Sequence, residues 1–213
     1  MRRSILLMND WLFKYKNNDF INVNLPHTWN NIDGQDGGND YYRGSCTYER
    51  KVSKPMFDLL KEDVYLVFEG VNASATIVFN NHEVIKHDGG YSTFRVNVTE
   101  FLKDENDLKI IVDNSVNDKV YPQNADFTFY GGIYRDVYFL VINKTRFDID
   151  YYGGPGIKYY STVNGNDATV FVETFSNSDN VFIELYDQEN NLVLKQKGTK
   201  VSFLVKDAHL WNG

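Results

Sequence analysis

The sequence predicts an all-β protein built as an antiparallel β-sandwich, and three observations support this prediction. Short segments that alternate apolar and polar residues follow one another closely, with turn residues between them. No long stretch repeats its apolar residues at the helical period of 3.6. Aromatic residues make up 15% of the chain, and most are Tyr and Phe, which favour strands. Patterns of this kind are typical of sandwiches and barrels.

The N-terminal part is expected to hold strands on either side of a polar loop. Residues 10–15 and 41–51 alternate and are predicted as strands, and Pro26 keeps residues 25–30 extended. Residues 31–39 contain three Gly and two Asp, which is typical of a long polar loop.

The middle of the chain carries further short strands. Residues 80–82, Asn-Asn-His, are predicted as the turn of a β-hairpin, and residues 99–102 as a turn rather than a long helix. The alternating segments predicted as strands are 64–68, 75–79, 94–98, 107–114 and 136–142.

Residues 121–137 form an unusual connection between two of these strands. They read Tyr-Pro-Gln-Asn-Ala-Asp-Phe-Thr-Phe-Tyr-Gly-Gly-Ile-Tyr-Arg-Asp-Val. Ordinary connections are short and polar, so an aromatic one needs a surface to pack against. That surface could be the core of the same domain, a ligand or another domain.

A second β-rich unit is expected to begin after Asn143, where no Gly/Ser-rich linker intervenes. Its predicted strands are 168–175, 181–186, 192–197 and 200–205. The unit has only about 65 residues, against ~100 for a typical sandwich domain, so we expect it to be incomplete.

Composition and charge exclude several classes of partner. The net charge of −7 argues against a nucleic-acid surface, which requires clustered Lys and Arg. No apolar run is long enough to span a membrane, and residues 1–8 lack the features of a signal peptide. We therefore expect a cytoplasmic protein with no nucleic-acid and no membrane partner. The single cysteine, Cys46, excludes an internal disulfide and a cysteine-based zinc site, and it is predicted to be a buried strand residue.

Five motifs, in this order and spacing, give the chain a family resemblance. They are Leu-Pro-His-Thr-Trp at 25–29; Tyr-Arg at 42–43; Phe-Glu-Gly-Val-Asn-Ala at 68–73 with Phe-Asn-Asn at 79–81; His-Asp-Gly-Gly-Tyr at 87–91 with Phe94; and Gly-Gly-Ile-Tyr-Arg-Asp-Val at 131–137. With these motifs the chain resembles the N-terminal part of glycoside hydrolase family 2, the group of β-galactosidases, β-glucuronidases and β-mannosidases. Residues 151–156, Tyr-Tyr-Gly-Gly-Pro-Gly, are most similar to the β-galactosidase branch.

The resemblance implies a domain order. It assigns residues 1–144 to a jelly-roll (galactose-binding-like) sugar-binding domain and residues 145–213 to an incomplete immunoglobulin-like β-sandwich. In the family a (β/α)8 barrel follows and carries two catalytic glutamates, but this sequence shows no such alternation of strands and helices. The chain is therefore expected to contain no catalytic residue and to be inactive alone.

The implied function is that of the non-catalytic N-terminal part of a glycosidase, most similar to a β-galactosidase that hydrolyses terminal β-galactosides with retention. Retention requires two carboxyl groups ~5–5.5 Å apart, which the barrel would supply. The implied partners are the carbohydrate substrate, the missing barrel and, in a homo-oligomer, further copies of the chain.

Asp126 is the one residue that the resemblance assigns to substrate. In the family, an Asp just upstream of the Gly-Ile-Tyr/Phe-Arg-Asp-Val motif reaches the active site, contacts the galactose unit and in some members helps to hold sodium. Asp126 matches that position by its spacing from Arg135. A carboxylate can accept bonds from sugar hydroxyls and bind a hard cation. The alternative is an Asp that caps a loop. No cofactor is expected in this chain, with sodium and magnesium implied only for the whole enzyme.

Other polar residues have simpler interpretations. His27 is expected to pin an extended segment by hydrogen bonds, because buried polar groups are normally paired. His87 could contact a sugar, but Gly89 follows so closely that a turn role is favoured. Arg135 and Asp136 are expected to be structural, because Arg–carboxylate pairs fix loops well.

Two other functions fit the same sequence. The chain could be a stand-alone carbohydrate-binding module, because jelly rolls bind sugars in many contexts. It could also be a structural or oligomerisation module that contacts no sugar. Affinity of the isolated chain for galactose or lactose would favour the binding module. No affinity, together with an exposed aromatic patch over residues 127–130, would favour part of a larger enzyme.

Overall fold

The computed structural model describes residues 2–31, 41–121 and 128–210. Contacts within the chain divide it into two compact units, Met1–Asn143 and Lys144–Gly213. The sequence placed this boundary one residue later. In the described residues, helix is limited to single 3-10 turns at Thr99–Phe101 and Tyr151–Gly153, and the other regular elements are strands. The all-β prediction is therefore confirmed.

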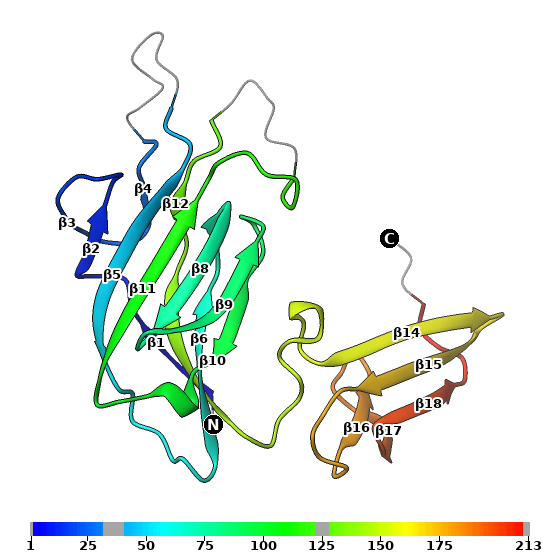
Figure 1. Ribbon diagram of the computed structural model, residues 1–213. Helices are drawn as coiled ribbons and strands as arrows, with labels where there is room; N and C mark the ends of the chain where they lie inside the picture. Colours follow the sequence, from blue (N-terminus) through cyan, green and yellow to red (C-terminus); the bar gives the residue numbers. More distant parts are fainter. Residues whose placement is uncertain (1, 32–40, 122–127, 211–213) are drawn as a thin grey trace. The chain divides into compact units, whose positions relative to one another are not determined.

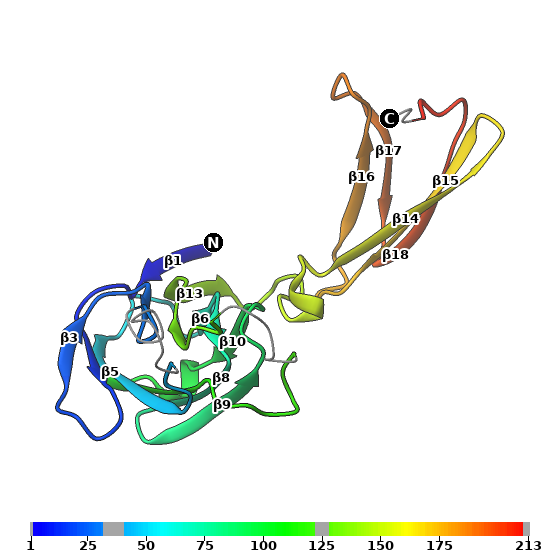
Figure 2. The same cartoon turned by 90° about the horizontal axis from the view of Figure 1, so that it is seen from above.

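The first unit is a sandwich of two antiparallel sheets that face each other (Figure 2). The larger sheet consists, in spatial order, of β3 (Ile21–Val23), β2 (Trp11–Lys14), β5 (Ser45–Ser53), β11 (Glu105–Asp113), β8 (Ser74–Phe79) and β9 (His82–Asp88). The smaller sheet consists of β1 (Arg2–Leu6), β13 (Val137–Asn143), β6 (Glu62–Phe68) and β10 (Phe94–Asn97).

Strand alternation produces the core between these sheets. Along β11, Leu108, Ile110 and Val112 are buried and point to one side. They share one hydrophobic cluster with Leu66 and Phe139 of the smaller sheet. Each such side chain contributes roughly 1.5–3 kcal/mol when it leaves water, so the core provides the main stabilisation. Cys46 also lies in this cluster, as predicted.

The predicted hairpin at residues 80–82 joins β8 to β9. Asn80 and Asn81 have φ angles of 50° and 68°, the left-handed values of a type I′ turn. The Asn80 amide donates to the carbonyl of Phe101 at 2.7 Å and to the Asn106 side chain at 2.8 Å. The turn is thereby tied to the segment that enters β11.

A small third sheet closes one end of the sandwich. It joins β4 (His27–Thr28), β12 (Gly132–Ile133) and β7 (Val71–Asn72), which are far apart in the sequence. Gly132 has a φ of 143°, and a Cβ there would lie 2.3 Å from the His27 carbonyl oxygen. Only glycine allows so close an approach of β12 to β4.

The second unit consists of a three-stranded and a two-stranded antiparallel sheet. The first contains β14 (Ile157–Asn164), β15 (Asp167–Thr174) and β18 (Lys200–Val205), and the second contains β16 (Phe182–Tyr186) and β17 (Leu192–Lys197). Val181, Val201 and Phe203 are buried in this unit. Every residue of β14 is exposed to solvent.

Two of the longer strands were not predicted. β1 is an edge strand that pairs with β13 from Arg2 to Leu6, and most of its residues are exposed. β14 is likewise an edge strand. Alternation arises from burial on one face, so strands exposed on both faces lack the signal.

Among the described residues, no helix is long and apolar enough to cross a membrane.

Candidate functional site

The candidate site is the end of the first unit near the small third sheet. The described residues that flank positions 32–40 and 122–127 come together here, and Figure 1 shows β4 and β12 beside them. These flanking residues are called the loop stems below: residues 29–31 and 41–43 for one segment, and residue 121 and residues 128–131 for the other. Their contacts determine what this end of the domain can present.

Two buried asparagines connect the stems. The Asn30 side-chain oxygen accepts the backbone N–H of Gly131 at 2.7 Å and the Asn114 amide at 3.1 Å. The amide of Asn30 donates to the Tyr42 carbonyl at 3.0 Å. Asn114 also donates to the carbonyl of Phe129 at 3.3 Å, and its own oxygen accepts Gly44 N–H at 2.9 Å.

Both side chains are fully buried, so water cannot reach their polar groups. The hydrogen bonds within the protein take the place of bonds to water. This set of contacts, the asparagine network, ties the stem of one segment to the stem of the other.

An aromatic and cationic contact reinforces the same connection. The Tyr41 hydroxyl accepts the backbone N–H of Phe129 at 3.3 Å and the Arg43 Nε at 2.9 Å. The guanidinium of Arg43 lies 4.9 Å from the Tyr41 ring and 5.8 Å from the Phe129 ring. Phe129 is only 4% exposed, so it belongs to the interior. A guanidinium cation and the face of an aromatic ring attract each other, and more strongly when they are partly buried. This attraction helps to hold the two rings in position.

Three tyrosines, Tyr91, Tyr121 and Tyr134, lie beside the stem formed by residue 121 and residues 128–131, and they are called the tyrosine cluster below. Asn72, which is buried, accepts the Tyr121 hydroxyl at 2.6 Å and donates to the Tyr130 carbonyl at 2.7 Å. The Tyr121 ring stacks on Tyr91 with centroids 4.9 Å apart. Burial and the neighbouring Tyr91 raise the pKa of Tyr121, so its hydroxyl remains protonated and available as a donor. The Tyr134 hydroxyl donates to the Gly90 carbonyl.

The glycine pair at 131–132 permits this compact arrangement. A Cβ on Gly131 would lie 2.1 Å from the ring of Trp29. The carbonyl of Gly131 accepts the Thr28 hydroxyl at 2.8 Å and the Trp29 N–H at 3.3 Å. The chain therefore needs glycine at residue 131 because an indole ring occupies the space of a side chain.

His27 has the structural role that the sequence predicted. Its Nδ1 lies 2.7 Å from the Tyr48 hydroxyl, and its ring is 4.6 Å from that of Phe13. Burial lowers the pKa of His27, because charging the imidazole away from water is unfavourable. A neutral histidine bonded to a core tyrosine holds β4 in place.

The predicted substrate residue lies outside the described residues. Asp126 falls within 122–127, as does Phe127, so their positions are not described. Of the neighbouring aromatics, Phe129 is buried, whereas Tyr130 is 40% exposed. An exposed aromatic patch over residues 127–130 therefore cannot include Phe129, which packs inward.

Two further sequence candidates, His87 and Arg135, have structural roles. His87 Nε2 lies 3.0 Å from the Gly89 carbonyl and 3.1 Å from the Ser92 hydroxyl, which is the favoured turn role. The Arg135 guanidinium lies over the Tyr134 ring at 5.3 Å and 3.5 Å from the Tyr91 carbonyl. Arg135 thus braces the tyrosine cluster from its exposed side.

The asparagine network was not predicted. Asn30 was assigned to an extended segment and Asn114 to the end of a strand. A single sequence gives little sign of it, because the pair is 84 residues apart and Asn next to a loop normally indicates a turn. The available signal was that both asparagines lie beside long connections whose ends must meet.

No described group of three or more His, Cys, Asp or Glu residues could hold a metal ion.

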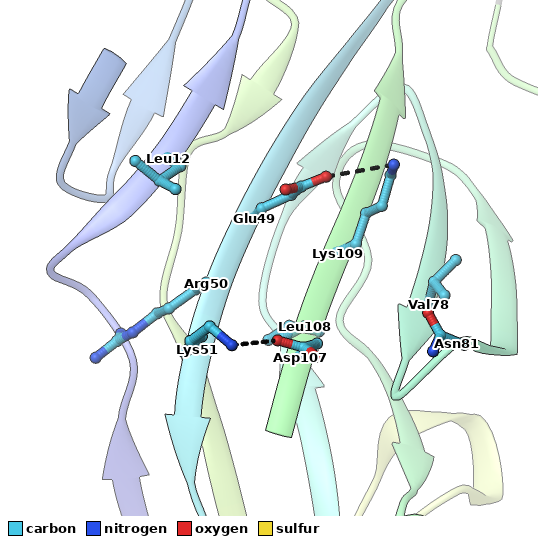
Figure 3. A pocket seen from close by; sticks show the side chains of 9 residues that line it. All are labelled: Leu12, Glu49, Arg50, Lys51, Val78, Asn81, Asp107, Leu108 and Lys109. Carbon is cyan, nitrogen blue, oxygen red and sulfur yellow. Dashed lines mark hydrogen bonds and ion pairs between the residues drawn. The ribbon is translucent and has the colours of Figure 1, made fainter. Parts of the chain in front are cut away.

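A separate shallow groove of about 330 Å³ lies on the outer face of the larger sheet (Figure 3). Four of its charged side chains form two ion pairs, and the guanidinium of the fifth, Arg50, lies 5.9 Å from the Trp11 ring. Lys109 Nζ lies 3.3 Å from Glu49, and Lys51 Nζ lies 3.2 Å from Asp107. Exposed pairs of this kind contribute little and compete with any ligand, so this face is an ordinary solvated surface.

Comparison with known proteins decides the family. Residues 39–149 match the "Glycosyl hydrolase 2 galactose-binding domain-like" family. The chain belongs to glycoside hydrolase family 2. The matched residues include the stem at 41–43, the tyrosine cluster and the Gly-Gly-Ile-Tyr-Arg-Asp-Val motif.

Family 2 relatives agree along most of the chain. It is 35% identical over 162 residues to a β-glucuronidase of Bacteroides fragilis, covering 73% of this chain and 23% of that protein. It is 34% identical over 158 residues to a β-galactosidase of Thermoanaerobacterium thermosulfurigenes, covering 64% of this chain and 21% of the relative.

Solved structures of the family agree as well. The crystal structure of an FMN-binding β-glucuronidase from Facaelibacterium prausnitzii L2-6 matches with a TM-score of 0.83 and 35% identity, over 99% of this chain and 35% of that one. A putative β-galactosidase from Bacteroides fragilis matches with a TM-score of 0.82 and 28% identity, over all of this chain and 37% of that one. This chain thus spans about a quarter of the curated relatives described here.

Proposed function

We propose that this chain is the non-catalytic N-terminal part of a family 2 glycosidase, and that the loop stems place residues 32–40 and 122–127 where they shape the sugar site. The observation that carries the proposal is the asparagine network, in which Asn30 and Asn114 join the two stems by buried hydrogen bonds. Because the stems are already ordered without a ligand, less conformational freedom is lost when a ligand binds. The entropic cost of binding is therefore smaller.

Asp126 is the proposed substrate contact. It lies four residues before Tyr130, whose carbonyl accepts the Asn72 amide, and nine before Arg135, whose guanidinium donates to the Tyr91 carbonyl. A carboxylate at residue 126 can accept hydrogen bonds from sugar hydroxyls. Sodium at Asp126 and magnesium elsewhere in the enzyme are proposed from the family resemblance alone.

The relatives support a substrate class for this proposal. Both β-galactosidases and β-glucuronidases resemble the chain, and these names share a terminal β-linked pyranose. The Tyr-Tyr-Gly-Gly-Pro-Gly segment at 151–156 favours terminal β-galactosides, which is the proposed substrate class. The β-glucuronidase identities of 35% make a β-glucuronide the second candidate.

The proposal that this chain helps to bind the sugar while the barrel carries out catalysis can be tested in two steps. The purified chain is expected not to hydrolyse nitrophenyl β-galactoside or β-glucuronide, since two facing carboxyl groups of a barrel are required. Robust hydrolysis that co-purifies with the chain would contradict the proposal.

The role of Asp126 is tested in a longer polypeptide that joins this chain to a family 2 barrel, such as a chimera with the Bacteroides fragilis relative. There Asp126→Ala should lower kcat/KM by about tenfold or more, as expected when one hydrogen bond to a charged group is lost. Asp118→Ala, at an exposed position in the same connection, is the matched control. Equal activity of the two variants would exclude a substrate contact at Asp126.

The stand-alone binding module makes a different prediction. If the isolated chain itself binds sugar, titration with galactose, lactose or glucuronate should shift the NMR signals of residues beside the stems, such as Tyr91 and Tyr130. Millimolar or tighter affinity would favour that module over a part that works only together with the barrel.

A further inference from the structure

One buried side chain holds both ends of the connection that carries Asp126. Asn72 of β7 is only 4% exposed. Its oxygen accepts the hydroxyl of Tyr121 at 2.6 Å, and its amide donates to the carbonyl of Tyr130 at 2.7 Å. Tyr121 directly precedes residues 122–127 in the sequence, and Tyr130 follows them closely. A single amide group therefore links the point where this connection begins to the point where it ends.

Asn72 is itself held in place by its backbone and by a close glycine. In the small third sheet it pairs with Gly132, one residue after the stem. A Cβ on Gly90 would lie 2.2 Å from the Asn72 side-chain oxygen, so the turn between β9 and β10 passes directly against this amide. A buried side chain whose oxygen and nitrogen are both hydrogen-bonded has little freedom to turn. Asn72 can therefore act as a rigid link.

Aromatic contacts join the same two ends. The ring centroid of Tyr121 lies 5.8 Å from that of Phe129, which is buried and follows residues 122–127 in the sequence. On its other side the Tyr121 ring stacks on Tyr91, with centroids 4.9 Å apart. Aromatic pairs at these separations attract each other beyond the effect of burial. Burial also raises the pKa of Tyr121, so its hydroxyl remains a donor to Asn72 at neutral pH.

A link of this kind matters for a carboxylate that must meet a sugar hydroxyl. Asp126 lies five positions after Tyr121 and four before Tyr130. A hydroxyl–carboxylate hydrogen bond requires an oxygen–oxygen distance of about 2.5–3.0 Å, and misplacement by about 1 Å can greatly reduce a rate. Fixed ends leave a short connection fewer conformations, so less freedom is lost when a ligand binds.

We propose that Asn72 is a positioning residue for the sugar site: through Tyr121 and Tyr130 it sets where the connection begins and ends, and it thereby directs Asp126 toward the substrate. Asn72 can have this role only if Asp126 contacts the sugar, so the role rests on the proposed function. Asn72 acts without touching the substrate, because its oxygen and its nitrogen both bond to the connection.

Tyr121→Phe tests this role, because it removes the hydroxyl that bonds to Asn72 and keeps the ring. In the polypeptide that joins this chain to the barrel of the Bacteroides fragilis relative, it should lower kcat/KM by about three- to tenfold, as for the loss of one neutral hydrogen bond. In the Asp126→Ala background it should change kcat/KM by less than about twofold, because a residue that acts through Asp126 then has nothing to position. Rates are divided by the concentration of titrated active sites, so partial unfolding does not lower them.

Tyr186→Phe is the matched control. The Tyr186 hydroxyl donates to Glu184 at 2.7 Å in the second unit, so this variant also removes one tyrosine hydrogen bond, but away from the connection. It should leave kcat/KM unchanged in both backgrounds.

Asn72→Leu removes both bonds of the link while nearly keeping the size of the side chain. It should lower kcat/KM at least as much as Tyr121→Phe, again only when Asp126 is present. A buried substitution of this kind can prevent folding, so circular dichroism must show that the variant is folded. The test stands on Tyr121→Phe if it is not.

The outcomes separate the positioning role from the proposed function. If Asp126→Ala leaves kcat/KM unchanged, Asp126 does not contact the sugar, and the proposed function and the role of Asn72 are both overturned. If Asp126→Ala lowers kcat/KM but Tyr121→Phe does not, only the positioning role is overturned. The same conclusion follows if Tyr121→Phe lowers kcat/KM by an equal factor with and without Asp126, because its effect then does not pass through that carboxylate.

Discussion

The amide of Asn114 donates to the side-chain oxygen of Asn30 across 3.1 Å, although the two residues are 84 positions apart. Both side chains are fully buried, and together they bond to the backbone of Tyr42, Phe129 and Gly131. This relationship makes the ends of two long connections a single structural element. The family resemblance alone did not indicate it.

Removal of either asparagine should therefore be costly. Asn30→Ala or Asn114→Ala leaves buried backbone groups without partners, and each should lower the free energy of unfolding by roughly 1–3 kcal/mol. Because the two side chains bond to each other, the double variant should cost less than the sum. Urea denaturation of the four proteins measures this.

Asn22→Ala is the control for this pair, because Asn22 is an exposed residue of the edge strand β3. This substitution should change the free energy of unfolding by no more than about 0.5 kcal/mol. Strict additivity of Asn30→Ala and Asn114→Ala would mean that the two side chains stabilise the fold independently.

Gly131→Ala tests the packing of the same stem. The new methyl would lie 2.1 Å from the Trp29 ring, so the indole or β12 must move. Overpacking of this kind typically costs ~1–3 kcal/mol, and here Trp29 also donates to the Tyr42 carbonyl at 3.3 Å. The midpoint of thermal unfolding should fall, and the tryptophan fluorescence should change.

Gly154→Ala is the comparison, because a Cβ at residue 154 would be 3.4 Å from the Tyr151 carbonyl oxygen, an ordinary contact. It should be neutral, or stabilising by up to about 1 kcal/mol, through reduced freedom of the unfolded chain. A neutral Gly131→Ala would show that the stem can relax around Trp29.

The sequence could predict most of the fold because burial leaves a pattern. β11 alternates Leu108, Ile110 and Val112 with exposed positions, and β8 ends at the Asn-Asn turn. β1 and β14 were missed because strands exposed on both faces carry no such pattern.

The candidate site was predictable only in part, for a related reason. The aromatic character of residues 121–137 indicated a packed connection, and Phe129 and Tyr121 do pack. Asn30 and Asn114, however, acquire their role from a tertiary contact between distant segments. Local propensity describes an asparagine beside a loop as a turn residue, and only the assembled sandwich shows that these two face each other.

His27 should make stability depend on pH. Burial lowers its pKa in the folded state below the value of 6.5 expected when unfolded. The unfolded chain then binds more protons between these two pKa values, so the contribution is fully present above pH 6.5 and is lost as pH falls toward the folded pKa. Acidification from about pH 7.5 to about pH 5 should therefore destabilise the protein through this residue.

His27→Gln isolates that contribution. Glutamine does not titrate, so the variant should lose part of the decrease in unfolding free energy between about pH 7.5 and about pH 5, even if it is less stable at neutral pH. His82→Gln, at an exposed position of β9, is the matched control. The hypothesis fails if His27→Gln and the parent show the same pH dependence in urea titrations.

The β8–β9 turn gives a prediction about backbone conformation. Asn81 is exposed and has a φ of 68°, which glycine adopts readily and β-branched residues adopt at a cost. Asn-Gly is the preferred pair of a type I′ turn, so Asn81→Gly should keep or slightly raise stability. Asn81→Val should lower it by about 1–2 kcal/mol, because valine in this region is strained.

The same two substitutions at Asn22, which lies in an extended strand, should have the opposite order, since valine favours strands and glycine weakens them. Denaturation midpoints of the four variants therefore separate a conformational effect from a general preference for one side chain. If valine were tolerated at residue 81 as well as glycine, the turn would have to adopt another geometry, and amide exchange at His82 and Glu83 would reveal the altered register of β9.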